Sequence, residues 1–304
     1  MPKKPIAIEP VWSSSVAQSI EDAGAQAVRL SSDAEALIWT DYGQPKLLAQ
    51  TLMDNPQLTW VQLPWAGVDA FGEIIRMAPR FTCAKGAYAE PVAEHALALC
   101  LALGRAIPDR VRAKTWGKSF AKSLYDSTFV IVGGGGITAS LLTQLAPFRV
   151  KTIVVRNTNI PMPGASRTLQ LSDLSAAIPE ADFVVIAASL TEETRGVINR
   201  ETLALMKPTS YLVNIARGSH VILSDLLEAL GEGVIAGAAL DVTDPEPLPD
   251  SHPAWNESKL IITPHTADTP EQVEPLFAHR VFENTRAYLG TGPWVGEVSK
   301  TLGY

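Results

Sequence analysis

The stretch that decides the fold is FVIVGGGGITASLL, residues 129–142. Its apolar start predicts a buried strand, the four glycines predict a turn, and the residues that follow have the pattern of a helix. In this setting the first glycine allows a tight turn and the second lets the backbone approach a pyrophosphate, which the helix N-terminus can bind. We therefore predict a dinucleotide site at Gly133, Gly135, Gly136 and Ile137.

The third glycine of the usual G-x-G-x-x-G pattern is replaced here by Thr138. Glycine at that point permits close packing of the helix against the strand. A β-branched side chain is expected to push the helix outward, so we expect Thr138 to loosen cofactor binding somewhat without removing the site.

Strand-like and helix-like segments alternate along most of the chain. Six apolar strand segments between residues 128 and 265 are separated by helical ones, which is typical of a parallel sheet covered on both faces. Residues 1 to about 90 alternate in the same way, and a long apolar helix from about Pro91 is expected to contain the junction. The sequence thus predicts an α/β protein with two Rossmann-like domains, each a doubly wound parallel sheet, and a cleft between them.

The composition narrows the class of protein. The 304 residues carry a formal net charge of -7, which argues against a nucleic-acid or membrane-surface partner. The two cysteines have neither metal-site nor disulfide-framework spacing, so we expect no metal and a reducing compartment, the cytoplasm. The most apolar run, residues 93–104, is too short to span a bilayer, and no signal peptide is visible.

The end of the strand after the glycines bears on the choice of cofactor. NAD sites place an acidic residue about 20 residues further on, where it bonds the ribose 2′-hydroxyl. Here that position is Arg156, and no carboxylate occurs between Val150 and Leu171. A cation suits the 2′-phosphate of NADP, with a preference of about 10- to 150-fold. NADP(H) is therefore favoured and NAD(H) stays possible; the alternative is a solvated arginine at a strand end.

Three side chains suited to hydride-transfer chemistry follow successive strands. Arg217, Glu246 and His265 lie just past the fourth, fifth and sixth strand segments, where parallel sheets bind ligands. Arg217 can hold an α-carboxylate in bidentate fashion, and His265 can donate a proton to a ketone oxygen while Glu246 orients its ring. Each residue alone has an ordinary structural interpretation, but together they predict reduction of a 2-keto acid. His95 is expected to be structural, and so is His220, which is also a weaker candidate to line the cleft.

An ordered set of segments resembles the D-isomer-specific 2-hydroxyacid dehydrogenases. The segments are PWAGVD, AEHALAL, GGGGI, SLTEETRGVIN, LVNIARG, ALDVTDPEP, HPAW, TPHTA and the terminal LGY, from about residue 60 onward. The resemblance implies that Arg217, Glu246 and His265 form the catalytic set. It also implies a backbone cradle for the substrate carboxylate at Ala66, Gly67 and Val68, and cofactor contacts at Ser189, Thr194, Ala216, Arg217, Asp241 and His265. Ser189 stands where the family commonly has proline.

The same resemblance implies how the chain is divided and assembled. Both ends of the chain, residues 1–96 and 272–304, would form a substrate domain, and residues 97–271 between them would form a dinucleotide-binding domain. The protein would be a homodimer. Within the family, the short N-terminal domain, Trp39 and Arg156 most resemble the glyoxylate/hydroxypyruvate reductase branch, which usually prefers NADPH. This favours Trp39 as a wall of the substrate pocket over Trp39 as a core residue.

Taken together, these features predict a reductase of small 2-keto acids, such as glyoxylate or hydroxypyruvate. One alternative is an NADH-dependent dehydrogenase of a larger acid such as phosphoglycerate, against which the missing acidic residue near Arg156 counts. Another is a cofactor-sensing, corepressor-like binding protein, because such proteins keep the same three residues.

Overall fold

The computed structural model describes residues 3–41, 43–118 and 120–300, so the terminal LGY motif lies outside the described residues. The chain divides into a first unit, Met1–Tyr88 with Thr269–Tyr304, and a second unit, Ala89–Asp268. The expected divisions after residues 96 and 271 lie eight and three residues further along the chain. The first of them would cut α3 (Ala89–Gly104), which belongs to the second unit as a whole because it packs along α5 and the sheet there.

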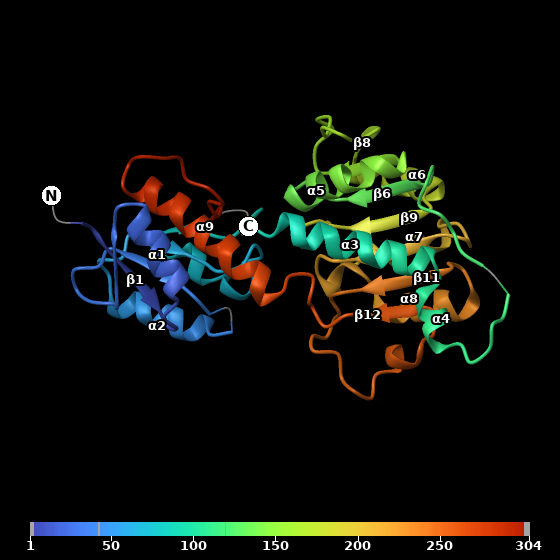
Figure 1. Ribbon diagram of the computed structural model, residues 1–304, viewed down its shortest axis with the longest axis horizontal. Coiled ribbons are helices and arrows are strands. Elements are labelled where there is room, and N and C mark those ends of the chain that lie inside the picture. Colours follow the sequence, from blue (N-terminus) through green and yellow to red (C-terminus); the bar gives the residue numbers. More distant parts are fainter. Residues whose placement is uncertain (1–2, 42, 119, 301–304) are drawn as a thin grey trace. The chain divides into compact units, whose positions relative to one another are not determined.

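The first unit is a parallel sheet with helices on both faces. Its strand order is β2-β1-β3-β4-β5, and each of these strands pairs with its neighbours in parallel. The strands are β1 (Pro5–Glu9), β2 (Gln26–Val28), β3 (Ala36–Trp39), β4 (Trp60–Gln62) and β5 (Arg80–Thr82). The helices are α1 (Ser14–Asp22), α2 (Pro45–Asp54) and α9 (Pro270–Tyr288). Helices α1 and α9 cover one face and α2 the other (Figure 1).

The end of the chain completes this first unit through buried contacts. Helix α9 packs beside α1, and Asn284 of α9 donates a hydrogen bond to the side chain of Gln62 in β4 at 2.7 Å. Both side chains are fully buried, so the hydrogen bond between the two amides replaces the solvation that each would lose.

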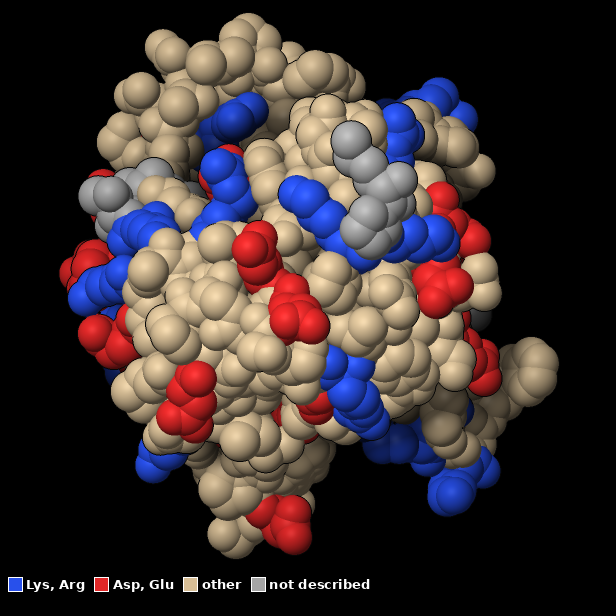
Figure 2. Space-filling view, turned by 90° about the vertical axis from the view of Figure 1, so that its left-hand side faces the viewer, with Lys and Arg blue, Asp and Glu red and all other residues tan. Residues whose placement is uncertain are grey.

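Strand β2 was not predicted because it has only three residues, none of them fully buried. Acidic and basic side chains are intermixed on the face of this unit seen in Figure 2.

The second unit has the larger parallel sheet. The strand order is β12-β11-β10-β9-β6-β7-β8, and each of these strands pairs with its neighbours in parallel. The strands are β6 (Thr128–Val132), β7 (Lys151–Arg156), β8 (Arg167–Gln170), β9 (Phe183–Ile186), β10 (Tyr211–Asn214), β11 (Gly237–Leu240) and β12 (Leu260–Ile262). Besides α3, the helices are α4 (Ile107–Arg112), α5 (Gly136–Leu145), α6 (Leu174–Ala177), α7 (Arg200–Ala204) and α8 (Leu223–Glu232).

The strand order reverses between β6 and β9. From β6 the chain builds outward through β7 to β8, then returns to β9 and builds in the opposite direction. In open α/β sheets ligands bind outside the carboxyl ends of strands at such a switch point. The central strands β6, β9, β10 and β11 are buried almost throughout, as expected for a sheet covered on both faces. Strand β8 was not predicted because it is an edge strand whose residues are all at least partly exposed.

This fold confirms the predicted α/β class with two doubly wound parallel sheets. The glycine turn lies at the carboxyl end of β6, and the three candidate catalytic residues follow β10, β11 and β12. None of the described helices combines the length and the apolar character needed to cross a membrane.

Candidate active site

The first glycine of the turn is required by its surroundings. Gly133 has φ +116°, and a Cβ atom built on it would lie 2.4 Å from the carbonyl oxygen of Ala187. Its N–H donates to Val155 at 2.7 Å, so the turn is fixed between the ends of β7 and β9. By contrast, nothing lies within 4 Å of a Cβ built on Gly135, the N-cap of α5. No side chain caps this helix, which leaves its first N–H groups for an anion.

Thr138 lies inside the glycine turn and forms a hydrogen bond there. The side chain is fully buried, and its hydroxyl donates a hydrogen bond to the carbonyl oxygen of Gly133 at 3.0 Å. The threonine therefore closes the turn with a side-chain hydrogen bond at the place where the usual pattern has glycine.

Arg156, the last residue of β7, lies over the same turn. A Cβ atom built on Gly134 would meet its Nε atom at 2.7 Å, so glycine is needed there for the arginine to lie where it does. Within the described part of the chain, the guanidinium makes one contact of hydrogen-bond type, to the sulfur of Met162 at 3.7 Å, and no ion pair. A cation without a carboxylate partner thus lies beside an uncapped helix N-terminus.

The hydroxyl of Thr194 forms hydrogen bonds within the loop after β9. This side chain is buried; its oxygen donates to the carbonyl of Ser189 at 2.9 Å and accepts from the N–H of Thr191 at 2.8 Å. The Thr194 hydroxyl is therefore used inside the loop. Ser189 itself is exposed and lies two residues after Ala187, whose carbonyl adjoins Gly133.

The loop after β10 carries Arg217, and the side chain of Asn214 holds this loop through hydrogen bonds to its backbone. The buried Asn214 side chain donates to the carbonyl of Arg217 at 2.8 Å and accepts from the N–H of Ala216 at 3.1 Å. The Arg217 guanidinium in turn donates to the carbonyl of Ala216 at 2.7 Å. Sequence reasoning missed Asn214, although a buried amide at a strand end just before an arginine is a recognisable signal.

The loops that carry Arg217 and Glu246 touch each other. A Cβ atom built on Gly218 would lie 2.0 Å from the backbone of Thr243, and the hydroxyl of Ser219 donates to the carboxylate of Asp244. His220 is fully buried, with its ring nitrogens near the carbonyls of Arg217 (3.0 Å) and Ser189 (3.4 Å). It therefore joins two loops of the site and does not line an open surface of this unit.

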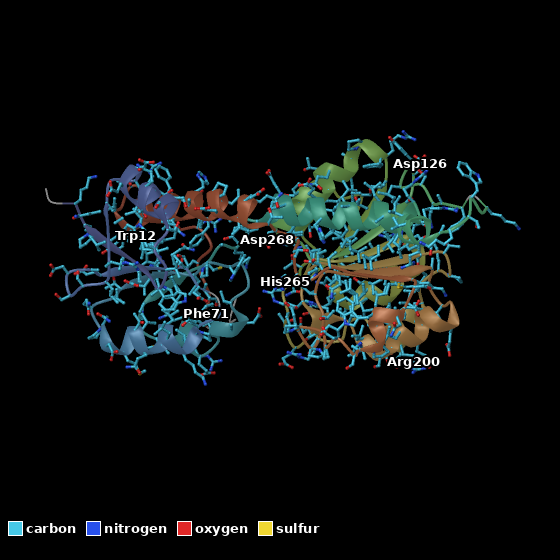
Figure 3. The ribbon with its side chains drawn as sticks, turned by 60° about the horizontal axis from the view of Figure 1, so that its bottom comes forward. Trp12, Phe71, Asp126, Arg200, His265 and Asp268 are labelled. Carbon is cyan, nitrogen blue, oxygen red and sulfur yellow. The ribbon has the colours of Figure 1, made fainter. Side chains whose placement is uncertain are left out.

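Glu246 and His265 form a direct pair. The Nδ1 atom of His265 lies 2.6 Å from Oε1 of Glu246, and both side chains are nearly half exposed, at 46% and 42%. Since a carboxylate accepts, Nδ1 carries the hydrogen. No group in the described residues bonds the other ring nitrogen, Nε2. The strands of the second unit point toward the end of that unit where His265 lies (Figure 3).

The backbone of His265 is held in an unusual conformation. Its φ is +52°, in the left-handed region that non-glycine residues rarely adopt. The N–H of His265 donates to the carbonyl of Asp241 at 2.8 Å, and the carboxylate of Asp241 accepts from the N–H groups of Thr266 and Ala267. Burial alone would raise the pKa of Asp241, but hydrogen bonds from His95, Thr263 and Thr266 outweigh it and lower the pKa.

The first unit holds the other predicted residues. Ala66, Gly67 and Val68 follow β4, in a loop tied down by hydrogen bonds to the carbonyls of Pro64 and Trp65 from Tyr88 and Ala84. Val68 is buried and Ala66 is exposed.

Trp39 is a core residue of the first unit, as in the interpretation that we ranked second. Its side chain is only 1% exposed and belongs to the same apolar cluster as Val68 and Phe71. Its indole N–H is buried and has no hydrogen-bond partner among the described residues.

The arrangement suits a dinucleotide and an acid–base reaction. The second unit brings together the glycine turn, Arg156, and the loops of Arg217, Glu246 and His265 at the carboxyl edge of its sheet. In the described residues, no group of three or more His, Cys, Asp or Glu side chains could hold a metal ion.

Comparisons with known proteins identify relatives of this chain. Residues 96–267 match the family described as D-isomer specific 2-hydroxyacid dehydrogenase, NAD binding domain. The chain is 37% identical over 303 residues to an uncharacterized Corynebacterium melassecola protein from the proB 3′ region, with 97% of both chains covered. It is 31% identical to human glyoxylate reductase/hydroxypyruvate reductase over 76% of this chain and 74% of the human one.

A solved structure has the same fold over the whole chain. It is a D-isomer specific 2-hydroxyacid dehydrogenase from Xanthobacter autotrophicus Py2, crystallised with NADPH and MES, with a TM-score of 0.85 at 24% identity. The match covers 99% of this chain and 100% of that one. Sequence and fold together show that the chain belongs to the D-isomer specific 2-hydroxyacid dehydrogenase family, an NAD(P)-dependent enzyme family, and to its glyoxylate/hydroxypyruvate reductase-like branch.

Proposed function

We propose that this enzyme reduces small 2-keto acids, glyoxylate and hydroxypyruvate among them, to D-2-hydroxy acids, with NADPH as the preferred cofactor. The observation that carries the proposal is the 2.6 Å contact between His265 and Glu246 on loops that adjoin the loop of Arg217. The name of the human relative, a glyoxylate and hydroxypyruvate reductase, supports the substrate class.

The cofactor would lie along the glycine turn. Gly133, Gly135, Gly136 and Ile137 would receive its pyrophosphate, because the turn is open at Gly135 and the helix is uncapped. Arg156 would pair with the 2′-phosphate, since no carboxylate of the described residues competes for it. When bound, NADPH supplies the hydride. Further contacts are proposed at Ser189, Thr194, Ala216 and Asp241.

Contacts through Thr194 and Asp241 would involve groups that are already engaged. The hydroxyl of Thr194 serves its own loop, and the carboxylate of Asp241 is 1% exposed among protein donors. We therefore propose that both act chiefly by shaping the surfaces that face the cofactor.

The acid–base step would use the three strand-end residues. Arg217 would bind the substrate carboxylate and polarise the adjacent ketone, while the N–H groups of Ala66, Gly67 and Val68 would cradle the same carboxylate. Nε2 of protonated His265 would donate its proton to the ketone oxygen as the carbonyl carbon is reduced. Glu246 would hold the ring through Nδ1 and stabilise its charge until the proton is transferred. The half-exposed ring would then be reprotonated from solvent.

The proposal includes the setting of the enzyme. We propose a homodimer, as is usual in this family, that works in the cytoplasm. Both cysteines of the chain are buried and unpaired, which is consistent with a reducing compartment.

The test is a matrix of substrates and cofactors followed at 340 nm. Glyoxylate, hydroxypyruvate and phosphohydroxypyruvate are each offered with NADPH and with NADH. The proposal expects the highest kcat/KM for the two small acids with NADPH. Preference for the phosphorylated acid with NADH would instead support the phosphoglycerate dehydrogenase alternative. Nucleotide binding without turnover of any acid would support the cofactor-sensing alternative.

A further inference from the structure

A buried carboxylate holds the loop that carries His265. Asp241 is the residue directly after β11, and its side chain is 1% exposed. Its backbone carbonyl accepts from the N–H of His265 at 2.8 Å, and its carboxylate accepts from Thr266 at 2.9 Å and Ala267 at 3.2 Å. These three donors are consecutive residues, so one aspartate fixes the backbone at His265 and just beyond it.

A further donor reaches the same carboxylate from helix α3. The Nε2 atom of His95 lies 3.3 Å from Oδ1 of Asp241 and 3.1 Å from the hydroxyl oxygen of Thr263. Thr263 uses its own proton to donate to Oδ1 of Asp241 at 2.6 Å. The hydrogen between His95 and Thr263 must therefore come from the ring, which makes Nε2 of His95 a donor to both oxygens.

We infer that His95 is a positioning residue for His265, and that it acts as a hydrogen-bond donor to Asp241 and Thr263. A non-glycine backbone with φ of +52° persists only where its surroundings fix it, and the contacts from Asp241 are among those that do so here, together with the carbonyl of Thr263, which accepts from the N–H of His265 at 3.0 Å. His95 orients this carboxylate and so keeps the His265 loop in place. The inference rests on the proposed function only where it concerns turnover.

The geometry also indicates how large the effect is. Without His95, Asp241 keeps the Thr263 hydroxyl and the two loop amides, so the loop loosens while the unit stays folded. Loss of one such hydrogen bond corresponds to a change of roughly five- to tenfold. The donor role requires a hydrogen on Nε2, while Nδ1 of His95 has no partner in the described residues.

Amide exchange tests the inference without any use of activity. His95→Phe removes the donor and keeps a ring, whereas His95→Gln places a neutral N–H donor at similar reach. Glu94→Gln, an exposed neighbour on α3, is the matched control. In His95→Phe the amides of His265, Thr266 and Ala267 should exchange roughly five- to tenfold faster, while those of α8 stay unchanged. His95→Gln and Glu94→Gln should behave like the wild type. Wild-type exchange in His95→Phe, or equal acceleration in His95→Gln, overturns the inference.

Kinetics then separate positioning from simple stability. In His95→Phe, kcat for glyoxylate should fall roughly five- to tenfold, while KM for NADPH and glyoxylate stays within about twofold, because the loop acts in the transition state. His95→Gln should restore kcat. An unchanged kcat in His95→Phe would contradict the role. If the wild type reduces no keto acid, the proposed function fails, and the exchange experiment alone decides the inference.

Discussion

The hydroxyl of Thr138 lies 3.0 Å from the carbonyl oxygen of Gly133 and donates a hydrogen bond to it. This contact joins the first turn of α5 to the end of β6, inside the loop proposed to bind the cofactor. A threonine at the third position of the glycine pattern thus stabilises the turn from within.

Thr138→Val tests this contact. Valine has nearly the same shape but leaves the buried carbonyl of Gly133 without its partner, at a cost of about 1–3 kcal/mol. We expect a lower unfolding temperature and weaker NADPH binding by fluorescence titration, both restored in Thr138→Ser. A valine variant that matches the wild type in both measurements would show that the hydrogen bond has no such role.

Arg156→Asp should reverse the cofactor preference. The variant loses the proposed partner of the 2′-phosphate and gains an acceptor for a 2′-hydroxyl, so kcat/KM for NADPH should fall by about 10- to 150-fold while that for NADH is retained or rises. Arg105→Asp, at an exposed arginine of the same unit, is the control for the change of charge. An equal loss of kcat/KM with both cofactors would show that Arg156 supports the fold and does not bind the 2′-phosphate.

Glu246→Gln should lower turnover while it keeps the ring of His265 in place. The amide oxygen can still accept from Nδ1, but the charge that stabilises the protonated ring is lost. A charge-assisted bond of this kind contributes about 1.5–3 kcal/mol, so kcat should fall by about 10- to 150-fold. Glu232→Gln at the exposed end of α8 controls for the loss of one negative charge. Wild-type kcat in Glu246→Gln would remove Glu246 from the mechanism.

Asp241 should contribute to stability at neutral pH and lose that contribution in acid. Its pKa is lower in the folded protein than in the unfolded chain, despite burial, because of the donors around it. The contribution is therefore complete above the unfolded pKa and is lost as the pH falls through the folded pKa. Asp241→Asn should unfold at lower temperature at pH 7, and its stability should fall less steeply in acid. An acid limb parallel to that of the wild type would contradict this.

The sequence predicted those parts of the protein that have local signals. The glycine turn could be found because an apolar strand precedes Gly133 and a helix follows Gly136, and the three catalytic candidates each follow an apolar strand segment. Strands β2 and β8 were not predicted, because both are short strands at the edge of a sheet and none of their residues is fully buried.

Other features depend on contacts between distant segments. The partner of the Thr138 hydroxyl is the backbone carbonyl of Gly133, a contact that the sequence did not predict. The role of Gly218 comes from its close contact with the backbone of Thr243 in the next loop, and His95 meets Asp241 across nearly half the chain. Such pairings are decided by the packed fold, and no local pattern announces them.

The central claim is that His265 is the proton donor in the reduction of a small 2-keto acid. The most direct test measures NADPH oxidation with glyoxylate and hydroxypyruvate for the wild type and His265→Ala, with the Kd for NADPH determined in parallel. The account predicts rapid wild-type turnover, a loss of about 10²- to 10⁴-fold in kcat for the variant, and an NADPH Kd within about twofold of the wild type. A His265→Ala variant that keeps the wild-type rate would contradict it.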